Sequence, residues 1–438
     1  MSVAARTPFL AVKDRAIRLS GGMADYDALL AMTEGRRFVL LGEATHGTAD
    51  FYRMRAEITR RLIAEQGFDS VAVEGDWPDA WRVNRFVQGG ADADVATALG
   101  DFERFPLWMW RNREVADFIG WLRDHNLAQM RPTRAGFYGL DMYSLYRSAD
   151  AVIAYLQRVD PEQAQRARER YAILDHVREP QAYGFEAAAG LRESGHEAAI
   201  EQLQQLRTLT AEHLPKDGVA VLDEQFYAER NAALVVNAET YYRAMFGRRV
   251  NTWNLRDAHM ADTLFALAEH RRRLGGTGRV VVWAHNSHLG DARATEVHER
   301  GEWNLGQLVR ERAGREQALL VGFTTYTGHV AAAAEWGGEV EHRWVRPALT
   351  GSYEQLFHST HLDRFFLPLQ GHEVERLHQS MLERAIGVLY LPHTERGSHY
   401  FDASLASQFD AVFHLDETAA VEPLDMPAYW HRPEAAEA

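Results

Sequence analysis

Short apolar runs and helical repeats alternate along the first third of the chain. Residues 37–41 (RFVLL) form an apolar run that predicts a buried strand, and residues 48–66 follow with apolar side chains at helical spacing. The same order returns with a run at 70–74 (SVAVE), a helical segment at 79–87 and a third run at 136–140. Strands separated by helices are typical of βαβ units in a parallel sheet.

The pattern changes in the middle of the chain. Residues 148–278 are rich in Ala, Glu, Gln and Arg at helical spacing and contain no convincing strand. Apolar runs then return at 279–284 (RVVVWA), 318–325 (ALLVGFTT) and 386–391 (IGVLYL). We therefore predict an α/β fold with a mostly parallel central sheet flanked by helices, and a long helical insertion that forms a subdomain. The expected divisions are a first part of the α/β core at 1–147, the helical subdomain at 148–278, a second part of the core at 279–431 and a disordered tail at 432–438.

Composition narrows the chemistry. The 438 residues carry a net charge of −14, from 62 acidic and 48 basic side chains, so the basic footprint that nucleic acid or an anionic membrane requires is not expected. The chain has no cysteine, which excludes a thiolate nucleophile, a disulfide scaffold and cysteine-ligated metal clusters. Its 20 histidines leave His, carboxylates, hydroxyls or a bound cofactor as sources of chemistry.

Neither end of the chain nor its interior indicates a membrane segment. The first residues lack the apolar stretch of a signal peptide, and no run of about 18 apolar residues occurs. We therefore expect a cytoplasmic protein, whose oligomeric state the sequence leaves open.

Histidines and acidic residues follow four of the predicted strands. Taken strand by strand, they are Glu43 and His46, Glu74 and Asp76, Asp141, and His285 and His288. Ligands of open parallel sheets bind at the carboxyl ends of the strands, where such side chains converge if the strands share one sheet. The sequence therefore predicts one functional site assembled from distant parts of the chain.

Of these segments, residues 42–47 (GEATHG) contain the side chains best suited to catalysis. The Glu43 carboxylate, three residues before His46, can hold the tautomer of the imidazole and stabilise its protonated form, as a general base requires. Gly42 and Gly47 would permit a tight backbone there. The alternative is structural: a loop carboxylate that binds the N–H groups of the next helix, beside an incidental histidine.

The other candidates also have structural alternatives. A lone carboxylate at Glu74, after a buried strand, would be costly, and Arg55 is the counter-charge we expect for it. His285 and His288 suit metal ligation, oxyanion stabilisation or substrate contact, or each is a packed core histidine. Residues 254–257 (NLRD), with His259 and Met260, lie on a predicted helix that could face the pocket, but their spacing favours an exposed, ion-paired helix face. No nucleophile elbow, H-E-x-x-H helix, P-loop or dinucleotide fingerprint occurs.

Five ordered motifs resemble the erythromycin esterase family. They are LLGEATHGT at 40–48, the helix that carries Arg55, VAVEGDW at 71–77, NLRDAHM at 254–260 and VWAHNSH at 282–288. The resemblance implies a metal-independent hydrolase that opens the macrolactone ring of macrolide antibiotics and so confers resistance. The residues of these motifs are more similar to those of the broad group of relatives than to those of the resistance enzymes.

The resemblance also implies roles for individual residues. His46 would act as general base on water, with Glu43, Glu74 and His285 as further catalytic residues, while Arg55 and His288 would bind substrate. Our leading hypothesis is therefore hydrolysis of a small-molecule ester or lactone without a covalent intermediate and without a cofactor, in which His285 stabilises the oxyanion or returns the proton.

Two alternatives stay open. In one, a divalent metal is held by a cluster of imidazoles and carboxylates, namely His46, Glu43, Glu74, His285 and His288. In the other, the protein is a non-catalytic binding or accessory protein of carbohydrate biosynthesis.

Overall fold

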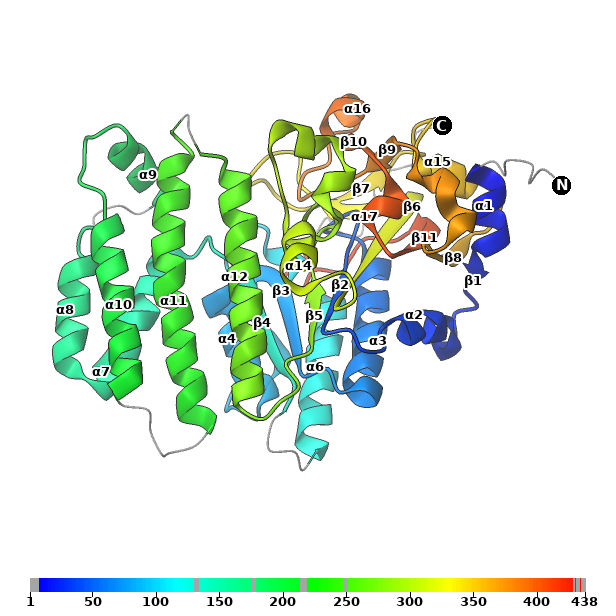
Figure 1. The fold of residues 1–438 in the computed structure, drawn as a ribbon. Helices are drawn as coiled ribbons and strands as arrows, with labels where there is room; N and C mark the ends of the chain where they lie inside the picture. The colour runs from blue at the N-terminus through cyan, green and yellow to red at the C-terminus, as the bar shows by residue number, and fades with distance from the viewer. Residues whose placement is uncertain are drawn as a thin grey trace. The chain divides into compact units, whose positions relative to one another are not determined.

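A computed structural model describes residues 8–129, 134–174, 179–212, 219–247, 250–427, 430 and 434 (Figure 1). The chain divides into two compact units. The first consists of Met1–Ala72, Phe86–Gly136 and Arg279–Ala438, and the second of Val73–Arg85 and Phe137–Gly278. The domain boundaries predicted from the sequence stay predictions, and the expected tail at 432–438 lies outside the described residues except for Glu434.

The first unit is built on a mixed sheet whose strands lie in the order β1-β8-β11-β6-β2-β5, with β7 paired to β6. The centre is parallel: β2 pairs with both β5 and β6, and β11 pairs with β6. The pairs β1–β8, β8–β11 and β6–β7 are antiparallel. The strands are β1 (Ile17–Arg18), β2 (Phe38–Leu41), β5 (Val280–Trp283), β6 (Ala318–Ala332), β7 (Glu341–Val345), β8 (Arg364–Pro368) and β11 (Ala411–Thr418), with a separate hairpin of β9 (Met381–Arg384) and β10 (Tyr400–Ala403).

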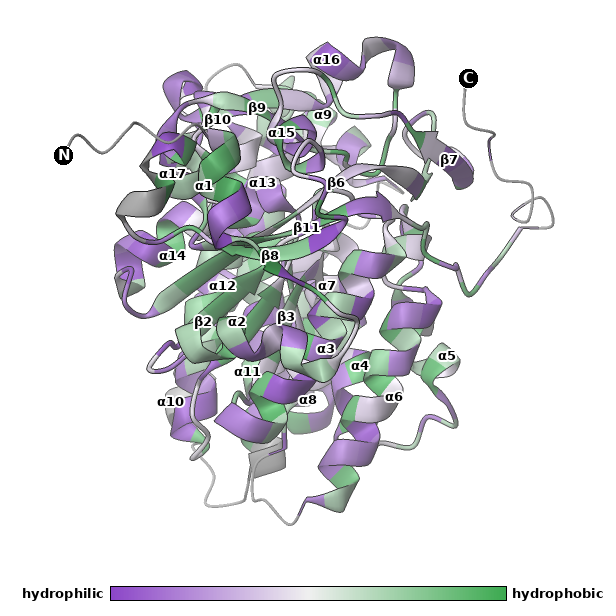
Figure 2. Cartoon of the chain, turned by 90° about the vertical axis from the view of Figure 1, so that its right-hand side faces the viewer, coloured by the Kyte–Doolittle hydropathy of each residue, from purple (hydrophilic) through white to green (hydrophobic). Residues whose placement is uncertain are grey.

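Helices cover this sheet. The α-helices that lie wholly within the unit are α1 (Pro8–Arg15), α2 (Asp27–Met32), α3 (Ala49–Gln66), α5 (Val95–Ala98), α6 (Arg113–Ala128), α13 (Asn286–Leu289), α14 (Leu305–Ala313), α15 (Tyr353–His358), α16 (Glu395–Ser398) and α17 (Leu405–Gln408). The central strands β2 and β5 are buried along their whole length, which explains why they consist of apolar residues alone. Figure 2 shows β2 and β8 as largely hydrophobic, whereas α6 alternates between hydrophilic and hydrophobic residues, as expected of a helix with one packed face.

The second unit is mostly helical. Its long helices are α7 (Leu145–Val159), α8 (Pro161–Tyr171), α9 (Pro180–Ala188), α10 (His196–Glu212), α11 (Val219–Ala244) and α12 (Thr252–Arg273). Helix α11 packs against α7, α9, α10 and α12, and α10, α11 and α12 stand side by side in Figure 1. The unit also contains nearly all of β4 (Gly136–Asp141), the end of β3 (Ser70–Asp76) and most of α4 (Trp77–Val87).

One predicted strand is wrong. Residues 386–391 make only isolated bridges, from Ile386 to Thr45 and from Leu389 to Ala333, and the regular strand β9 ends at Arg384. This apolar segment is therefore used to pack beside other loops rather than to extend the sheet.

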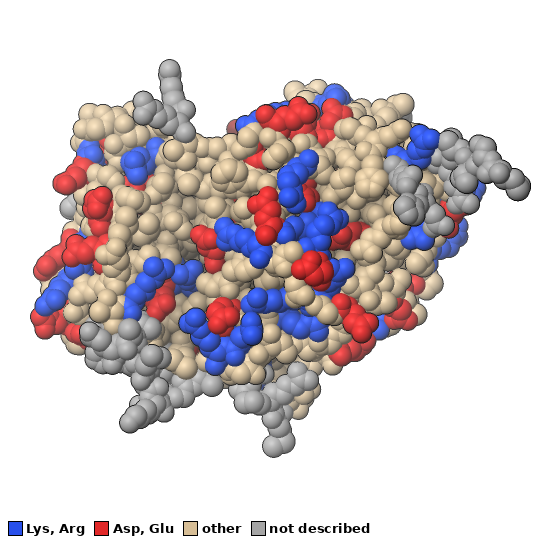
Figure 3. Space-filling model, viewed as in Figure 1, with Lys and Arg blue, Asp and Glu red and all other residues tan. Residues whose placement is uncertain are grey.

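The surface charges and the hydropathy of the helices agree with the expectations from the composition. Basic side chains lie among acidic ones on the face shown in Figure 3, without a large separate basic area. Within the described part of the chain, no helix combines the length and apolar character needed to cross a bilayer.

Candidate active site

Two glycines bracket the loop that joins β2 to α3. A Cβ atom on Gly42 would lie 2.1 Å from the side-chain oxygen of Asn286, and one on Gly47 would lie 1.9 Å from the carbonyl oxygen of Ala331. Real Cβ atoms do not approach other heavy atoms this closely. The tight backbone that the sequence predicts here is therefore confirmed, and its cause is contact with neighbouring segments.

Hydrogen bonds from neighbouring segments fix the backbone of this loop. Among the donors are three backbone N–H groups from other parts of the first unit and a tyrosine hydroxyl from α3. The bonds run from Asn286 N to Glu43 O at 2.8 Å, from Ile386 N to Ala44 O at 2.7 Å, from the Tyr52 hydroxyl to His46 O at 3.0 Å and from Ala331 N to Gly47 O at 3.0 Å. A loop held in this way presents its side chains in one arrangement.

Glu43 binds two partners, one with each carboxylate oxygen. Its Oε1 lies 3.0 Å from Nδ1 of His46, and its Oε2 accepts a hydrogen bond of 2.6 Å from Arg55. Glu43 and Arg55 are fully buried and His46 is nearly so. An ionised carboxylate only accepts hydrogen bonds, so Nδ1 of a neutral His46 carries the proton and Nε2 carries the lone pair.

Aromatic rings surround the buried arginine. The guanidinium of Arg55 lies 4.3 Å from the ring centre of Tyr52 and 5.3 Å from that of Trp283. Contact with ring faces and one carboxylate stabilises a positive charge that burial would otherwise penalise. The structural alternative for Glu43 is not observed, because its two carboxylate oxygens contact His46 and Arg55 rather than the backbone N–H groups of α3.

His285 lies beside His46. The ring centres are 4.9 Å apart and the planes are inclined by 47°. His285 caps the short helix α13, because its Nδ1 accepts the backbone N–H of Ser287 at 3.2 Å; the Ser287 hydroxyl is 2.8 Å from the same nitrogen. His288 is buried within α13, and its predicted substrate contact stays a prediction.

Glu74 belongs to an ion-pair cluster in the second unit. Arg256 of α12 donates to Glu74 at 2.7 Å and to Asp141 at 2.6 Å. Burial on its own would raise the pKa of Asp141, but the charge and hydrogen bonds of Arg256 outweigh it and lower that pKa. Two expectations are therefore wrong. Arg55 pairs with Glu43 rather than serving Glu74, and the segment 254–257 is not an exposed face, since Asn254 and Asp257 are buried on α12 and the Arg256 side chain is only 14% exposed.

The structure thus brings Glu43, His46, Arg55 and His285 together in the first unit and places Glu74 in the second. Tyr52 and Ser287 were not assigned to the site from the sequence, and the ion pairs of Arg256 were not predicted. Ser287 and Arg256 both lie within recognised motifs, at 282–288 and 254–260, and this is the signal that could have found them.

The side chains of this site fit the metal-binding alternative poorly. Across the described ranges, no three His, Asp or Glu side chains gather in a way that could hold a metal ion. Both oxygens of Glu43 are engaged by His46 and Arg55. We derive no reaction step through a metal.

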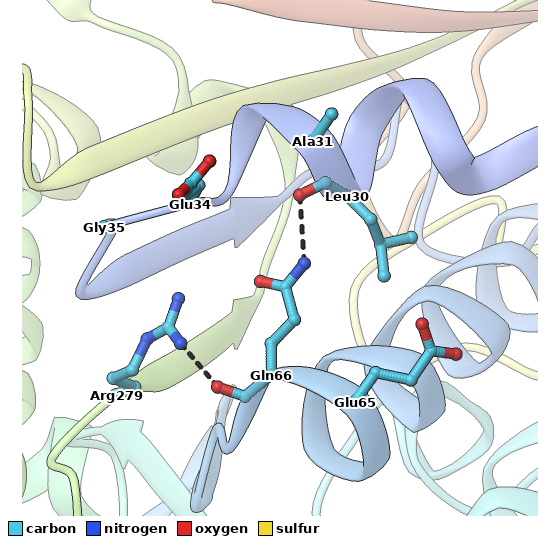
Figure 4. A pocket seen from close by; sticks show the side chains of 7 residues that line it. All are labelled: Leu30, Ala31, Glu34, Gly35, Glu65, Gln66 and Arg279. Atoms are coloured by element: carbon cyan, nitrogen blue, oxygen red, sulfur yellow. Dashed lines mark hydrogen bonds between the residues drawn. The ribbon is translucent and has the colours of Figure 1, made fainter.

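A pocket of about 400 Å³ lies elsewhere in the first unit (Figure 4). It is lined by α2, the end of α3 and Arg279, and the Gln66 amide donates to Leu30 O at 3.0 Å across it. Arg279 comes directly before β5, so this pocket is at the amino end of the parallel strands, opposite to the edge that holds His46 and His285.

Comparisons with known proteins agree with the fold and the motifs. A sequence model of the family described as erythromycin esterase matches residues 63–418. Erythromycin esterase type II of Escherichia coli is 22% identical over 424 residues, which cover 91% of this chain and 93% of that protein.

Two solved structures share the fold. A crystal structure of a succinoglycan biosynthesis protein has a TM-score of 0.77 at 22% identity and covers 95% of this chain and 97% of its own. A histidine-to-asparagine variant of the erythromycin esterase EreC, in its open conformation, has a TM-score of 0.67 at 16% identity and covers 92% and 96%. Because the family model spans most of the sequence, the chain belongs to the erythromycin esterase family.

Proposed function

We propose that this protein hydrolyses a carboxylic ester or macrolactone by direct attack of water, with His46 as general base and without a covalent intermediate. Membership of the erythromycin esterase family supports a hydrolase of that type. The observation that carries the mechanism is the buried group of Arg55, Glu43 and His46, joined by contacts of 2.6 and 3.0 Å.

The reaction begins at Nε2 of His46. This nitrogen takes a proton from water while the water oxygen forms a bond to the carbonyl carbon, and the electron pair of the C=O bond moves to its oxygen. When the tetrahedral intermediate collapses, the pair returns, the bond to the alcohol oxygen breaks and the imidazolium gives its proton to that oxygen. The products are one acid and one alcohol, or a hydroxy acid from a lactone.

Glu43 and Arg55 support this cycle without touching the water. The carboxylate holds the Nδ1–H of His46 and stabilises the imidazolium that forms on proton uptake. Arg55 orients the carboxylate through its hydrogen bond to Oε2. Glu74, in the other unit, is assigned a supporting catalytic role by the family resemblance, and His288 a role in binding substrate.

The first experiment asks whether any ester is cleaved. The purified protein is incubated with erythromycin A, other macrolides, simple lactones and 4-nitrophenyl acetate, and mass spectrometry detects a product heavier than the substrate by one water. We expect such a product from at least one compound. A panel with no product would contradict the proposal and favour the binding or accessory alternative.

The second experiment separates the metal-independent scheme from its alternative. Elemental analysis measures metal in protein purified without added metal, and activity is compared before and after chelation. We expect activity that chelation leaves unchanged. Stoichiometric metal together with activity lost on chelation and restored by adding the metal back would favour the metal-dependent mechanism.

A further inference from the structure

We propose that the backbone N–H of Ser287 fixes the tautomer of His285, so that His285 serves as a neutral hydrogen-bond donor that stabilises the oxyanion. Ser287 is then a positioning residue. The assignment of the tautomer stands on its own geometry, whereas the oxyanion role rests on the proposed ester hydrolysis.

The argument starts from the cap of α13. Nδ1 of His285 accepts the N–H of Ser287 at 3.2 Å, and the Ser287 hydroxyl lies 2.8 Å from the same atom. The hydroxyl can turn to donate or accept, but a backbone N–H only donates. Nδ1 therefore carries its lone pair, and the proton of the neutral ring is on Nε2.

The neighbouring histidine has the opposite tautomer. The Glu43 carboxylate holds a proton on Nδ1 of His46, which leaves the lone pair on Nε2. With ring centres 4.9 Å apart, the two imidazoles offer one acceptor and one donor side by side. Ester hydrolysis by water requires this combination, because the attacking water loses a proton while the carbonyl oxygen gains negative charge.

The same cap argues against His285 as the residue that returns the proton. An imidazolium carries N–H groups on both nitrogens, and its Nδ1–H would face the Ser287 N–H, donor against donor. His46 already holds the abstracted proton and can return it. The contacts thus assign different tasks to the two rings.

The tautomer is measured directly by NMR of the full chain labelled with ¹⁵N-histidine. Long-range ¹H–¹⁵N correlations at neutral pH distinguish a protonated Nδ1 from a protonated Nε2, and the signals lost in His285→Gln and His46→Gln provide the assignments. We expect the proton on Nε2 for His285 and on Nδ1 for His46. A proton on Nδ1 of His285, alone or on both nitrogens, would overturn the proposal.

Ser287→Ala separates the backbone from the hydroxyl. Alanine keeps the N–H, so the spectrum should still report a proton on Nε2 of His285. A switch to Nδ1–H in this variant would show that the hydroxyl sets the tautomer and would contradict the role given to the backbone.

The catalytic part is tested with glutamine substitutions and 4-nitrophenyl acetate as the probe. A glutamine amide can donate a hydrogen bond near the position of Nε2, but it cannot take up a proton at neutral pH. We expect His285→Ala to lower kcat about 10²–10³-fold, and His285→Gln to recover at least about tenfold of that loss.

His46 is the matched control, because a base cannot be replaced by an amide. We expect His46→Gln to be as inactive as His46→Ala. Equal losses in His285→Gln and His285→Ala would overturn the donor role. If the wild-type protein does not cleave the probe, the proposed function loses support for this ester class, while the NMR result still decides the tautomer.

Discussion

Glu43 is the residue on which the proposed site depends most, because its two oxygens bind His46 and Arg55. Glu43→Gln removes the negative charge and leaves a buried guanidinium with no ionised partner. We expect a fall in kcat and a loss of roughly 3–5 kcal/mol in the free energy of unfolding, measured with urea. Glu103→Gln, at an exposed position, is the control and should change neither quantity.

A second substitution separates stability from catalysis. In Glu43→Gln/Arg55→Met the uncompensated charge is gone, so much of the lost stability should return while activity stays low. Recovery of activity along with stability would mean that the carboxylate has no catalytic role.

His399 gives stability a pH dependence that can be isolated. Its Nε2 accepts the backbone N–H of Leu391 at 2.8 Å, and burial, with the charge of Arg384, lowers the pKa of His399 to about 4. The unfolded chain takes up this proton near pH 6.5, so it binds more protons than the folded chain between pH 6.5 and 4. Stability therefore falls as the pH falls through that window.

The substitution His399→Gln keeps an acceptor for Leu391 but cannot titrate. The difference in unfolding free energy between pH 7 and pH 4.5 should shrink by about 1–3 kcal/mol in this variant. His393→Gln, at an exposed histidine, should leave that difference unchanged. An equal pH response in both variants and the wild type would exclude His399 as the source.

At the scale of elements, the loop between β2 and α3 is fixed by close backbone contacts. Gly47→Ala would place a methyl group 1.9 Å from Ala331 O, so we expect a loss of roughly 1–3 kcal/mol in urea unfolding and a lower kcat. Gly397→Ala adds the same methyl group where nothing lies within 4 Å, and should stay within about 0.5 kcal/mol of the wild type. Similar effects of the two substitutions would contradict the contact argument.

Helix α12 contributes Arg256 to a buried cluster with Glu74 and Asp141. Arg256→Gln leaves two carboxylates without their counter-charge, so we expect a loss of roughly 3–5 kcal/mol at pH 7.5. The loss should be smaller at pH 3, which is below the ordinary Asp pKa of 3.8. In the wild type the lowered pKa of Asp141 gives stability that is present at neutral pH and lost in acid, and the variant lacks it.

Arg273→Gln is the matched control on the same helix, because Arg273 is exposed and forms a surface ion pair with Glu269. Urea unfolding of the three proteins at both pH values provides the comparison. A loss in Arg256→Gln that is independent of pH would count against the carboxylates as its cause.

The central strands could be predicted because burial on both faces requires continuous apolar runs, as in β2 and β5. The strands near the carboxyl end of the sequence could not. Residues 386–391 are as apolar as a strand but pack singly beside other loops, and β7 is too polar to stand out. An apolar pattern indicates that a segment is buried, but whether it pairs as a strand depends on neighbouring segments that are distant in the sequence.

At the scale of the whole molecule, parallel pairing explains why the site could be predicted in part. β2 and β5 are neighbours, so the residues after their carboxyl ends, Glu43 and His46 on one side and His285 on the other, meet. Which arginine serves which carboxylate depends on helix packing, and spacing in the sequence does not report it. Arg55 and Arg256 were therefore misassigned although both lie in recognised motifs.

The central claim is that His46 is the general base, and its most direct test is kcat/KM of His46→Ala on the ester or lactone that the wild type cleaves. We predict a fall of about 10²–10⁴-fold, with circular dichroism and the urea midpoint unchanged because the Glu43–Arg55 pair remains. His393→Ala, which removes an exposed histidine, should keep full activity. A His46→Ala protein that retains activity within a few-fold of the wild type would contradict the mechanism.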